Sequence, residues 1–303
     1  MCSKETLYAV SYYLEASSGL FGFIGALSIV IAYLLYKDLR TYYFQAVFYT
    51  SIADGLKAII YFIPISALKI SEVCYLCAIT TNYMTITSTM WSLFISVVLY
   101  QAIFKSIVKA EKYTKVWFVI IFCILPLVFL LPLITGSYGL VSINCTFKEN
   151  FSGNMWRIGL FYIPGWIMIF VSVYAYFTIF KRINFELIDT GTKIILRKVI
   201  LYPLLIIFLF IMLSILRILE IILPTSCGLA YFSAFCLSLY ASQGFWNAVI
   251  FFRTPLVRSI ICKRRHNRKL NCISSEVSAS SNINLLDSQN ILIKESTSLQ
   301  RLK

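Results

Sequence analysis

Histidine and acidic residues are scarce in this chain of 303 residues. It contains one histidine, His266, and 13 acidic residues against 27 basic ones. A metal site built from histidines inside a membrane is therefore excluded, and no Gly-Lys-Ser/Thr phosphate loop or repeated Cys-x-x-Cys pair is present. We expect no catalytic site, no metal and no cofactor, so the sequence predicts that this protein is not an enzyme.

Long apolar segments are abundant by contrast. Hydrophobic residues make up 59% of the chain and charged residues only 13%, which is more apolar surface than a soluble domain could bury. A helix needs about 20 apolar residues to cross a bilayer. The sequence therefore predicts an all-α membrane protein, a seven-transmembrane helix bundle. Its segments are Ala16 to Tyr36, Tyr42 to Ile63, Cys74 to Phe104, Val116 to Ile134, Ile158 to Phe180, Val199 to Leu223 and Leu229 to Phe252.

Basic residues lie mainly on one side of these segments. The first, third and fifth loops and the tail after Phe252 are rich in lysine and arginine, whereas the opposite side carries only Lys4, Lys69, Lys148 and Arg157. The positive-inside rule then places the amino terminus outside and the carboxyl terminus in the cytoplasm. The net charge of +14 is thus explained by topology and by contact with the anionic lipid bilayer, and we expect no nucleic acid partner.

Composition divides the chain into four parts. We expect a short extracellular amino terminus over 1–13, the bundle over 14–252, a juxtamembrane amphipathic helix over 253–262 and a disordered cytoplasmic tail over 263–303. The first part has no basic region followed by an apolar core, so we expect no cleaved signal peptide. In the tail, phosphorylated serines would recruit regulators, although an inert tail is an equal alternative.

The fourth loop carries two sequons and one cysteine. Asn144 and Asn150 begin Asn-x-Ser/Thr sequons on the side that the charges place outside, and both are candidate glycosylation sites. Cys145 is the only cysteine in this loop, and its expected disulfide partner is Cys74 or Cys77 at the outer end of the third segment. On the opposite side, Cys262 follows the last segment beside a basic cluster. Palmitoylation there and a plain free thiol are equal alternatives.

Ionisable residues interrupt two of the apolar segments. The second segment holds Asp54 and Lys57, and the sixth holds Arg217 and Glu220. Each pair is spaced i, i+3, so its members share a helix face, and such groups avoid lipid by facing the bundle interior or a wet cavity. Either the charges satisfy one another, or Lys57, Arg217 and Glu220 are candidate ligand-binding residues. Asp54 also lies near the level expected for Asn247 in the seventh segment, which predicts a polar network for switching.

Several local patterns resemble a known receptor family. Seven segments with an outside amino terminus resemble a G-protein-coupled receptor. Tyr202-Pro203, Arg217-Ile218 and the Gln243-Gly244-Phe245-Trp246-Asn247 run are similar to motifs of the cyclic-AMP-receptor-like (class E) family. Ser51-Ile52-Ala53-Asp54 resembles the small-residue-Asp motif of second spans. The seventeen-residue spacing from Cys74 to Trp91 is similar to that in the third span of this family and of secretin-like receptors.

The resemblance carries implications for function. It implies a plasma-membrane receptor that senses an extracellular small ligand, such as the nucleotide cyclic AMP, and activates a heterotrimeric G protein. It favours Cys74 as the partner of Cys145. It also implies a switch network of Asp54, Trp91, Gln243 and Asn247.

The chain departs from other receptor classes at several positions. Leu99-Tyr100-Gln101 stands where rhodopsin-like receptors have Asp-Arg-Tyr, and the seventh segment has no Asn-Pro-x-x-Tyr motif. That segment also lacks lysine, so it cannot form a retinal Schiff base. The rival interpretation is a seven-helix membrane transporter or channel, although no convincing internal repeat supports it.

Overall fold

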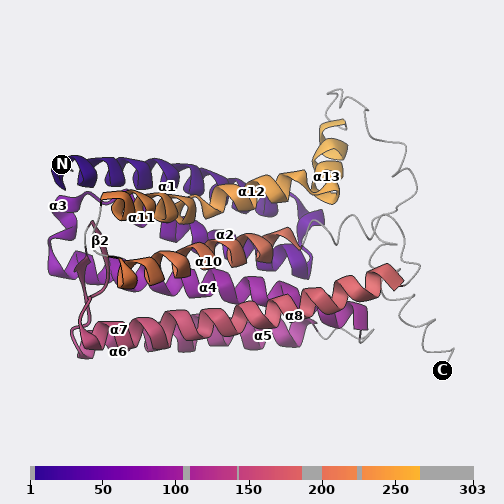
Figure 1. The fold of residues 1–303 in the computed structure, drawn as a ribbon. Helices are drawn as coiled ribbons and strands as arrows, with labels where there is room; N and C mark the ends of the chain where they lie inside the picture. The colour runs from indigo at the N-terminus through magenta and orange to yellow at the C-terminus, as the bar shows by residue number, and fades with distance from the viewer. Residues whose placement is uncertain (1–3, 105–109, 142, 186–199, 224–226, 267–303) are drawn as a thin grey trace.

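The computed structural model describes residues 4–104, 110–141, 143–185, 200–223 and 227–266. Over these residues the chain makes seven helical passes along one bundle, with a short β-hairpin at one end and α13 at the other (Figure 1). We refer to these as the hairpin end and the α13 end. The passes are α1 (Lys4–Leu35), α2 (Tyr42–Ile60), α4 (Ser71–Phe104), α5 and α6 (Ala110–Val119 and Leu125–Ile134), α7 and α8 (Phe151–Arg157 and Ile163–Phe185), α10 (Leu201–Ile222), and α11 and α12 (Cys227–Ala241 and Gln243–Arg253).

Length and hydropathy alone select fewer spans than the bundle has. Five of the described helices could cross a membrane on these criteria, or six if the bent pair α11 and α12 forms one span. The second pass, α2, is not among them, because Asp54, Lys57 and its other polar residues lower its mean hydropathy. It packs between α1 and α4, so protein rather than lipid surrounds its charged side chains.

The helix bounds differ from the predicted segments mainly at the hairpin end. The first pass already begins at Lys4 and the fifth at Phe151, so both are longer than the apolar segments they contain. The second pass ends at Ile60 rather than Ile63, because the chain turns into Pro64 and a proline disfavours helical backbone at the preceding residue. Pro64 caps the short helix α3 (Ile65–Leu68). Hydropathy thus locates the membrane-spanning parts but not the ends of the helices.

Two passes contain a π-helical turn before a proline. The turn at Ile120–Ile124 lies just before Leu125-Pro126, and the turn at Ile158–Tyr162 lies just before Ile163-Pro164. Proline has no N–H to donate, so a wider turn accommodates it without ending the helix.

The seventh pass bends by 43° between α11 and α12. The predicted segment Leu229 to Phe252 corresponds to these two helices, which are separated by a break at Ser242. The bend lies where α1 approaches most closely: a Cβ atom at Gly22 would lie 2.2 Å from the Ala241 carbonyl oxygen, and one at Gly244 would lie 2.3 Å from that of Gly22. Glycine at both positions therefore permits this close packing of α1 on the bend.

The fourth pass is followed by a hairpin that the sequence analysis did not predict. Strands β1 (Tyr138–Val141) and β2 (Asn144–Phe147) pair antiparallel, with Tyr138 opposite Phe147. Gly136 starts the connection with φ of 58°, a conformation that favours glycine. The rings of Tyr138 and Phe147 stack at 4.9 Å and are fully buried at the end of α4. The all-α prediction therefore holds for the bundle but not for this loop.

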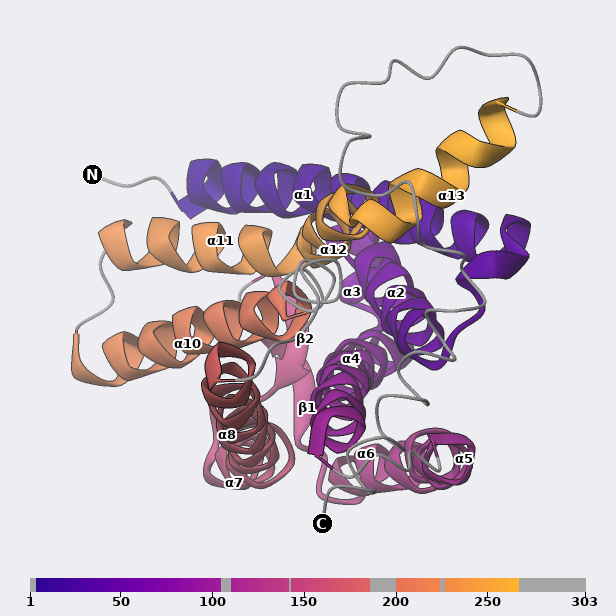
Figure 2. The ribbon, with the colours of Figure 1, turned by 90° about the vertical axis from the view of Figure 1, so that its right-hand side faces the viewer.

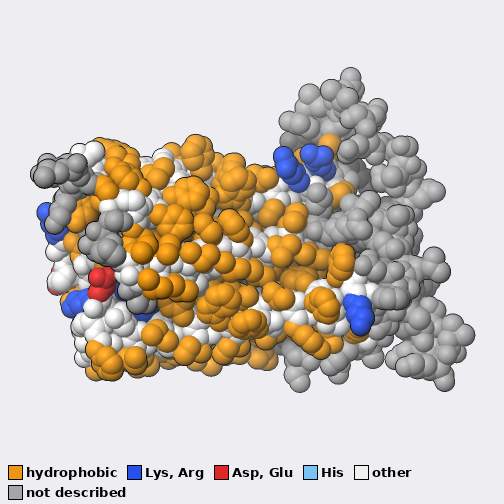
Figure 3. All heavy atoms as spheres, in the orientation of Figure 1, with side chains coloured by type: hydrophobic (Ala, Val, Ile, Leu, Met, Phe, Trp, Pro, Cys, Tyr) orange, Lys and Arg blue, Asp and Glu red, His pale blue; other side chains and the backbone are white. Residues whose placement is uncertain are grey.

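Helix α4 lies between its neighbours, whereas α5 and α6 lie at the edge of the bundle (Figure 2). It packs against α2, α8 and α10 and is the most buried of the long helices. Figure 3 shows a face of the bundle on which hydrophobic side chains form a broad band, with charged side chains at the two ends. The bundle thus offers an apolar surface to lipid along its sides.

Helix α13 (Pro255–His266) leaves the bundle at an angle after α12 (Figure 1). Val257 and Ile260 are buried against the end of the bundle, as expected for the apolar face of an amphipathic helix. The helix extends to His266, past Cys262, where we expected the amphipathic helix to end. Residues 267–303, with the serines of the tail, lie outside the described part of the chain.

Candidate functional site

Asp54, Lys57, Ser88, Gln243 and Asn247 form a buried polar network inside the bundle. They come from α2, α4 and α12, three passes that are far apart in the sequence. Asn247 Nδ2 donates to Asp54 Oδ2 at 2.7 Å, and Gln243 Nε2 donates to Ser88 Oγ at 3.0 Å. Gln243 Oε1 in turn accepts from Lys57 Nζ of α2 at 2.7 Å. These bonds therefore connect α2 to α12 directly and to α4 through Gln243 and Ser88.

Helical spacing explains why these side chains meet. Asp54 and Lys57 lie three residues apart on α2, and Gln243 and Asn247 lie four residues apart on α12, so each pair occupies one helix face. The two faces point at each other across the packed contact of α2 and α12. The expected proximity of Asp54 and Asn247 is present in the structure.

Lys57 is the cation of the buried network, and its side chain is fully buried. Its ammonium lies 3.5 Å from Asp54 Oδ1, donates to Gln243 Oε1 at 2.7 Å and lies 3.9 Å from the centre of the Tyr240 ring. Tyr240 precedes the bend of the seventh pass and Gln243 follows it. One lysine on α2 therefore contacts both sides of the bend.

Two acceptor atoms in the buried network take no hydrogen bond from the described residues. They are Asp54 Oδ1 and Asn247 Oδ1, and both residues are 1% exposed. Buried polar atoms in folded proteins are nearly always bonded. These two atoms give the network capacity for one more donor or cation.

Arg217, Glu220, Glu149, Tyr162 and Arg157 form an outer charged cluster at the hairpin end. Arg217 makes an ion pair with Glu220 and lies 3.7 Å from Glu149, and the Tyr162 hydroxyl lies nearby. Arg157 is 7% exposed and donates to the Phe147 carbonyl and to Asn154 Oδ1. The cluster thus joins α10 to the helix that follows the hairpin.

The structure separates the three residues proposed as ligand contacts. Arg217 and Glu220 belong to the outer charged cluster, with side chains 26% and 28% exposed. Lys57 lies in the buried network, and within the described residues no hydrogen bond or ion pair joins the two groups. A ligand that reaches Arg217 would therefore have to affect Lys57 through the helices between them.

Trp91 lies in the aromatic core rather than in the polar network. Its ring is fully buried, stacks on Tyr49 at 4.6 Å and meets Phe94 edge to face. Its Nε1 atom has no hydrogen-bond partner among the described residues. The resemblance grouped it with Asp54, Gln243 and Asn247, but the structure gives it packing contacts only.

A disulfide attaches the hairpin to the third pass. It joins Cys74 to Cys145, the pairing that the resemblance favoured, and Cys77 is a buried free thiol. Burial raises the pKa of the Tyr138 phenol, so its hydroxyl stays protonated and donates to the Phe129 carbonyl at 2.9 Å. These contacts hold the hairpin against the bundle.

The two sequon asparagines have different surroundings. Asn144 Nδ2 donates at 2.8 Å to the carboxylate of Glu15, which is 3% exposed on α1. Asn150 is exposed and caps α7, its Oδ1 accepting from the Gly153 N–H at 2.8 Å. The Asn144 amide is thus engaged within the fold, whereas Asn150 uses only its oxygen.

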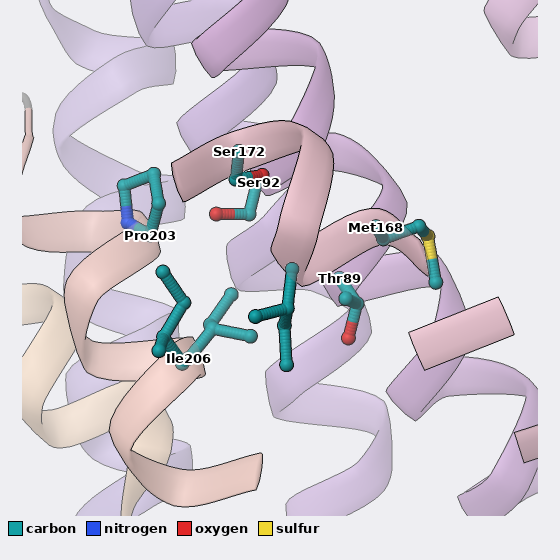
Figure 4. A pocket seen from close by; sticks show the side chains of 8 residues that line it. Thr89, Ser92, Met168, Ser172, Pro203 and Ile206 are labelled. Carbon is teal, nitrogen blue, oxygen red and sulfur yellow. The ribbon is translucent and has the colours of Figure 1, made fainter. Parts of the chain in front are cut away.

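Two cavities of the described bundle differ in size and position. Figure 4 shows one between α4, α8 and α10, lined by Thr89, Ser92, Met168 and Pro203, with a volume of about 10 Å³. That is room for a water molecule but not for a nucleotide. A groove of about 380 Å³ opens between α1 and the bent seventh pass, lined mainly by apolar side chains such as Phe21 and Trp246.

Comparison with known proteins decides the family. A family profile described as slime mold cyclic AMP receptor matches residues 3–266, nearly the whole bundle and α13. The chain belongs to the slime mold cyclic AMP receptor family. Its members are receptors of the G-protein-coupled type, which is a class of receptors and not of enzymes.

Two curated relatives are similar to part of this receptor. "Cyclic AMP receptor-like protein A" of Dictyostelium discoideum is 26% identical over 183 residues, 60% of this chain and 48% of the relative. "G-protein coupled receptor 1" of Arabidopsis thaliana is 22% identical over 162 residues, 54% of this chain and 49% of the relative. The receptor therefore spans about half the length of the curated relatives it matches.

A solved structure confirms the fold. Squid rhodopsin matches with a TM-score of 0.65 at 14% sequence identity, over 94% of both chains. At that identity the match shows the fold alone. The predicted seven-transmembrane receptor bundle is confirmed, and the receptor is a multi-pass membrane protein.

Some residues of both sites were missed by the sequence analysis. Ser88 and Tyr240 contact the buried network, yet a serine or tyrosine in an apolar helix carries no distinctive signal. Arg157 belongs to the outer charged cluster but was treated as a loop residue, because the fifth pass begins earlier than its apolar segment. Glu149 lies in the loop before α7, where an exposed acid carries no distinctive signal. Glu15 lies one residue before the first predicted segment, and extending that segment by one turn would have revealed a buried acid.

Proposed function

We propose that this receptor senses an extracellular small ligand and activates a heterotrimeric G protein. A cyclic nucleotide such as cyclic AMP is the first ligand to test, since the family and one relative are named for cyclic AMP receptors. The outer charged cluster supports an anionic ligand, because Arg217 is partly exposed at one end of the bundle. Its neighbours Glu149 and Glu220 would have to yield part of their contact with Arg217 to a phosphate.

The observation that carries this proposal is the position of the buried network across the bend of the seventh pass. Lys57 contacts Tyr240 before the bend and Gln243 after it, and Asp54 binds Asn247 one turn further on. A receptor needs an element with two arrangements whose populations the ligand shifts. A bend held by a few buried polar contacts is such an element, because small helix movements exchange its partners.

A reconstitution experiment tests the function. The purified receptor in liposomes, with an added heterotrimeric G protein, should accelerate GTP exchange when cyclic AMP or another active nucleotide is added outside. A transporter or channel should instead move labelled solute into the same liposomes without any G protein. Solute uptake without nucleotide-dependent exchange, across a panel of nucleotides and small metabolites, would refute the receptor proposal.

The orientation and cellular location belong to the same proposal. We place the hairpin end outside and α13 in the cytoplasm of the plasma membrane, on the basis of the charge distribution. The basic loops around Lys105 and Lys198 lie outside the described residues and would face the G protein. Tags at the two ends of intact cells should leave only the amino-terminal tag accessible to antibody, and an accessible carboxyl-terminal tag would overturn this orientation.

Covalent modifications follow from that orientation. Asn144 and Asn150 would be glycosylated outside, and Cys262, which is exposed on α13, would be palmitoylated inside. Thr146→Ala and Ser152→Ala remove the sequons one at a time while keeping both asparagines. A mobility shift after glycosidase treatment of each variant reports which site carries a glycan, and Cys262→Ala should abolish labelling by a palmitate analogue. Tail phosphorylation would be detected by mass spectrometry after stimulation.

A further inference from the structure

The buried network has the donor atoms of a cation site. Its oxygen atoms come from one carboxylate (Asp54), one hydroxyl (Ser88) and two amide groups (Gln243 and Asn247). Oxygen ligands of this kind suit hard cations. The ammonium of Lys57 already lies among them, 2.7 Å from Gln243 Oε1 and 3.5 Å from Asp54 Oδ1.

We propose that the buried network is a monovalent-cation site that the chain fills with its own lysine. In this view Lys57 is a tethered cation: its ammonium occupies the position that Na⁺ would take beside Asp54. The receptor would then be indifferent to Na⁺, because a cation attached to α2 cannot dissociate. This inference concerns ion binding and stability, so it holds or fails independently of the ligand and of G-protein coupling.

The charge balance favours a monovalent ion. Asp54 is the only carboxylate in the buried network, and the described residues contain no group of three or more His, Cys, Asp or Glu side chains that could hold a metal. One buried negative charge is neutralised by one positive charge, whereas a divalent ion would leave an uncompensated charge. Mg²⁺ or Ca²⁺ should therefore not substitute for the ammonium.

The unbonded acceptors supply the remaining ligands. Asp54 Oδ1 and Asn247 Oδ1 receive no hydrogen bond from the described residues, although both are buried. An ammonium has three donors, and Lys57 directs one at Gln243. An ion has no such directional limit, so it can bind all the surrounding oxygens when the ammonium is removed.

The substitution Lys57→Met tests the proposal. Methionine ends near the last methylene of lysine, so it keeps the buried packing and vacates the ammonium position. The thermal unfolding temperature of the purified receptor is compared in NaCl, KCl and N-methyl-D-glucamine chloride at equal ionic strength and pH 7.5. For Lys57→Met, the unfolding temperature in 300 mM NaCl should be about 3 °C higher than in N-methyl-D-glucamine chloride. This is the shift expected for an ion present at about ten times its dissociation constant.

Matched controls define the result. The wild-type receptor should show no difference between the three salts. The double variant Asp54→Asn/Lys57→Met should show none either, because it has no buried charge to attract the ion. If NaCl raises the unfolding temperature of the wild type by the same amount, or does not raise that of Lys57→Met, the proposal is wrong.

Two further outcomes are decisive. If acid stabilises Lys57→Met and Na⁺ does not, the Asp54 carboxylate takes a proton instead of a metal ion, and the cation site is refuted. If Lys57→Met is not recovered, Lys57→Gln is tested in the same salts. Failure to recover either variant in 300 mM NaCl means that an ion cannot replace the ammonium, which also rejects the proposal.

Discussion

Two pairs of opposite charges with the same spacing lie in very different surroundings in this receptor. Asp54 and Lys57 have side chains that are 0% exposed, whereas Arg217 and Glu220 are 26% and 28% exposed. The first pair is enclosed by α4 and the bent seventh pass, and the second lies at the hairpin end. Equal spacing in the sequence therefore predicts pairing, but neighbouring helices decide whether a pair fixes the bundle or stays accessible to a ligand.

The largest effect is expected from breaking the buried pair. Asp54→Asn leaves the Lys57 ammonium buried without its counter-charge, which should cost about 3–5 kcal/mol of unfolding free energy. Adding Lys57→Met to Asp54→Asn should restore most of the loss, since no charge is then left buried. Thermal unfolding of the three variants checks both statements. A loss below about 1 kcal/mol for Asp54→Asn would mean that the pair is no more enclosed than the outer one.

The next largest effect concerns the covalent link at the hairpin end. Removing the disulfide with Cys145→Ala should cost about 2–4 kcal/mol, because Cys74 and Cys145 are 71 residues apart and their link restricts the unfolded chain. Cys77→Ala is the matched control and should cost much less. Non-reducing peptide mapping of the wild type should find Cys145 linked to Cys74, and a peptide linking it to Cys77 would contradict the structure.

The smallest stability effect is expected at the outer pair. Arg217→Met and Glu220→Gln should each change the unfolding free energy by less than about 1 kcal/mol, as is usual for partly exposed ion pairs. If Arg217 binds an anionic ligand, Arg217→Met should weaken the ligand-evoked response, while Glu220→Gln should leave it intact or stronger.

A third variant sharpens that prediction. Glu149→Gln removes the weaker partner of Arg217, at 3.7 Å, and should behave like Glu220→Gln. If instead Arg217→Met and Glu220→Gln lower surface expression together, the pair is structural like the buried one. If ligand potency and surface expression are unchanged in both Arg217→Met and Glu220→Gln, Arg217 has neither a ligand-binding nor a structural role.

Local patterns predicted much of this molecule. Most of the passes follow from hydropathy, and the pairing of Asp54 with Lys57 follows from helical periodicity. The link from Asp54 to Asn247 was expected from their similar depth in the membrane. These features depend on residues within one helix, or on the shared thickness of the bilayer.

Features that depend on contacts between distant segments were not predictable. The bend at Ser242 lies where Gly22 of α1 packs against Ala241, and no pattern in the seventh segment reveals that contact. The hairpin strands have four residues each, too few for a period to be recognised. The contact of Lys57 with Gln243 joins two distant segments, so the sequence alone left open whether Lys57 pairs within the bundle or binds a ligand.

GTP exchange by the purified receptor and a heterotrimeric G protein, compared between wild type and Asn247→Ala, tests the central claim most directly. The claim is that the buried network across the bend controls the signalling state. Asn247→Ala removes the hydrogen bond to Asp54 and leaves the outer charged cluster intact. We predict that Asn247→Ala alters the basal exchange rate and reduces the increase that the ligand evokes. The affinity for a ligand at Arg217 should change only by the amount that follows from the shifted populations of the two receptor states. Unchanged basal and ligand-evoked exchange in a well-folded Asn247→Ala receptor would contradict the account.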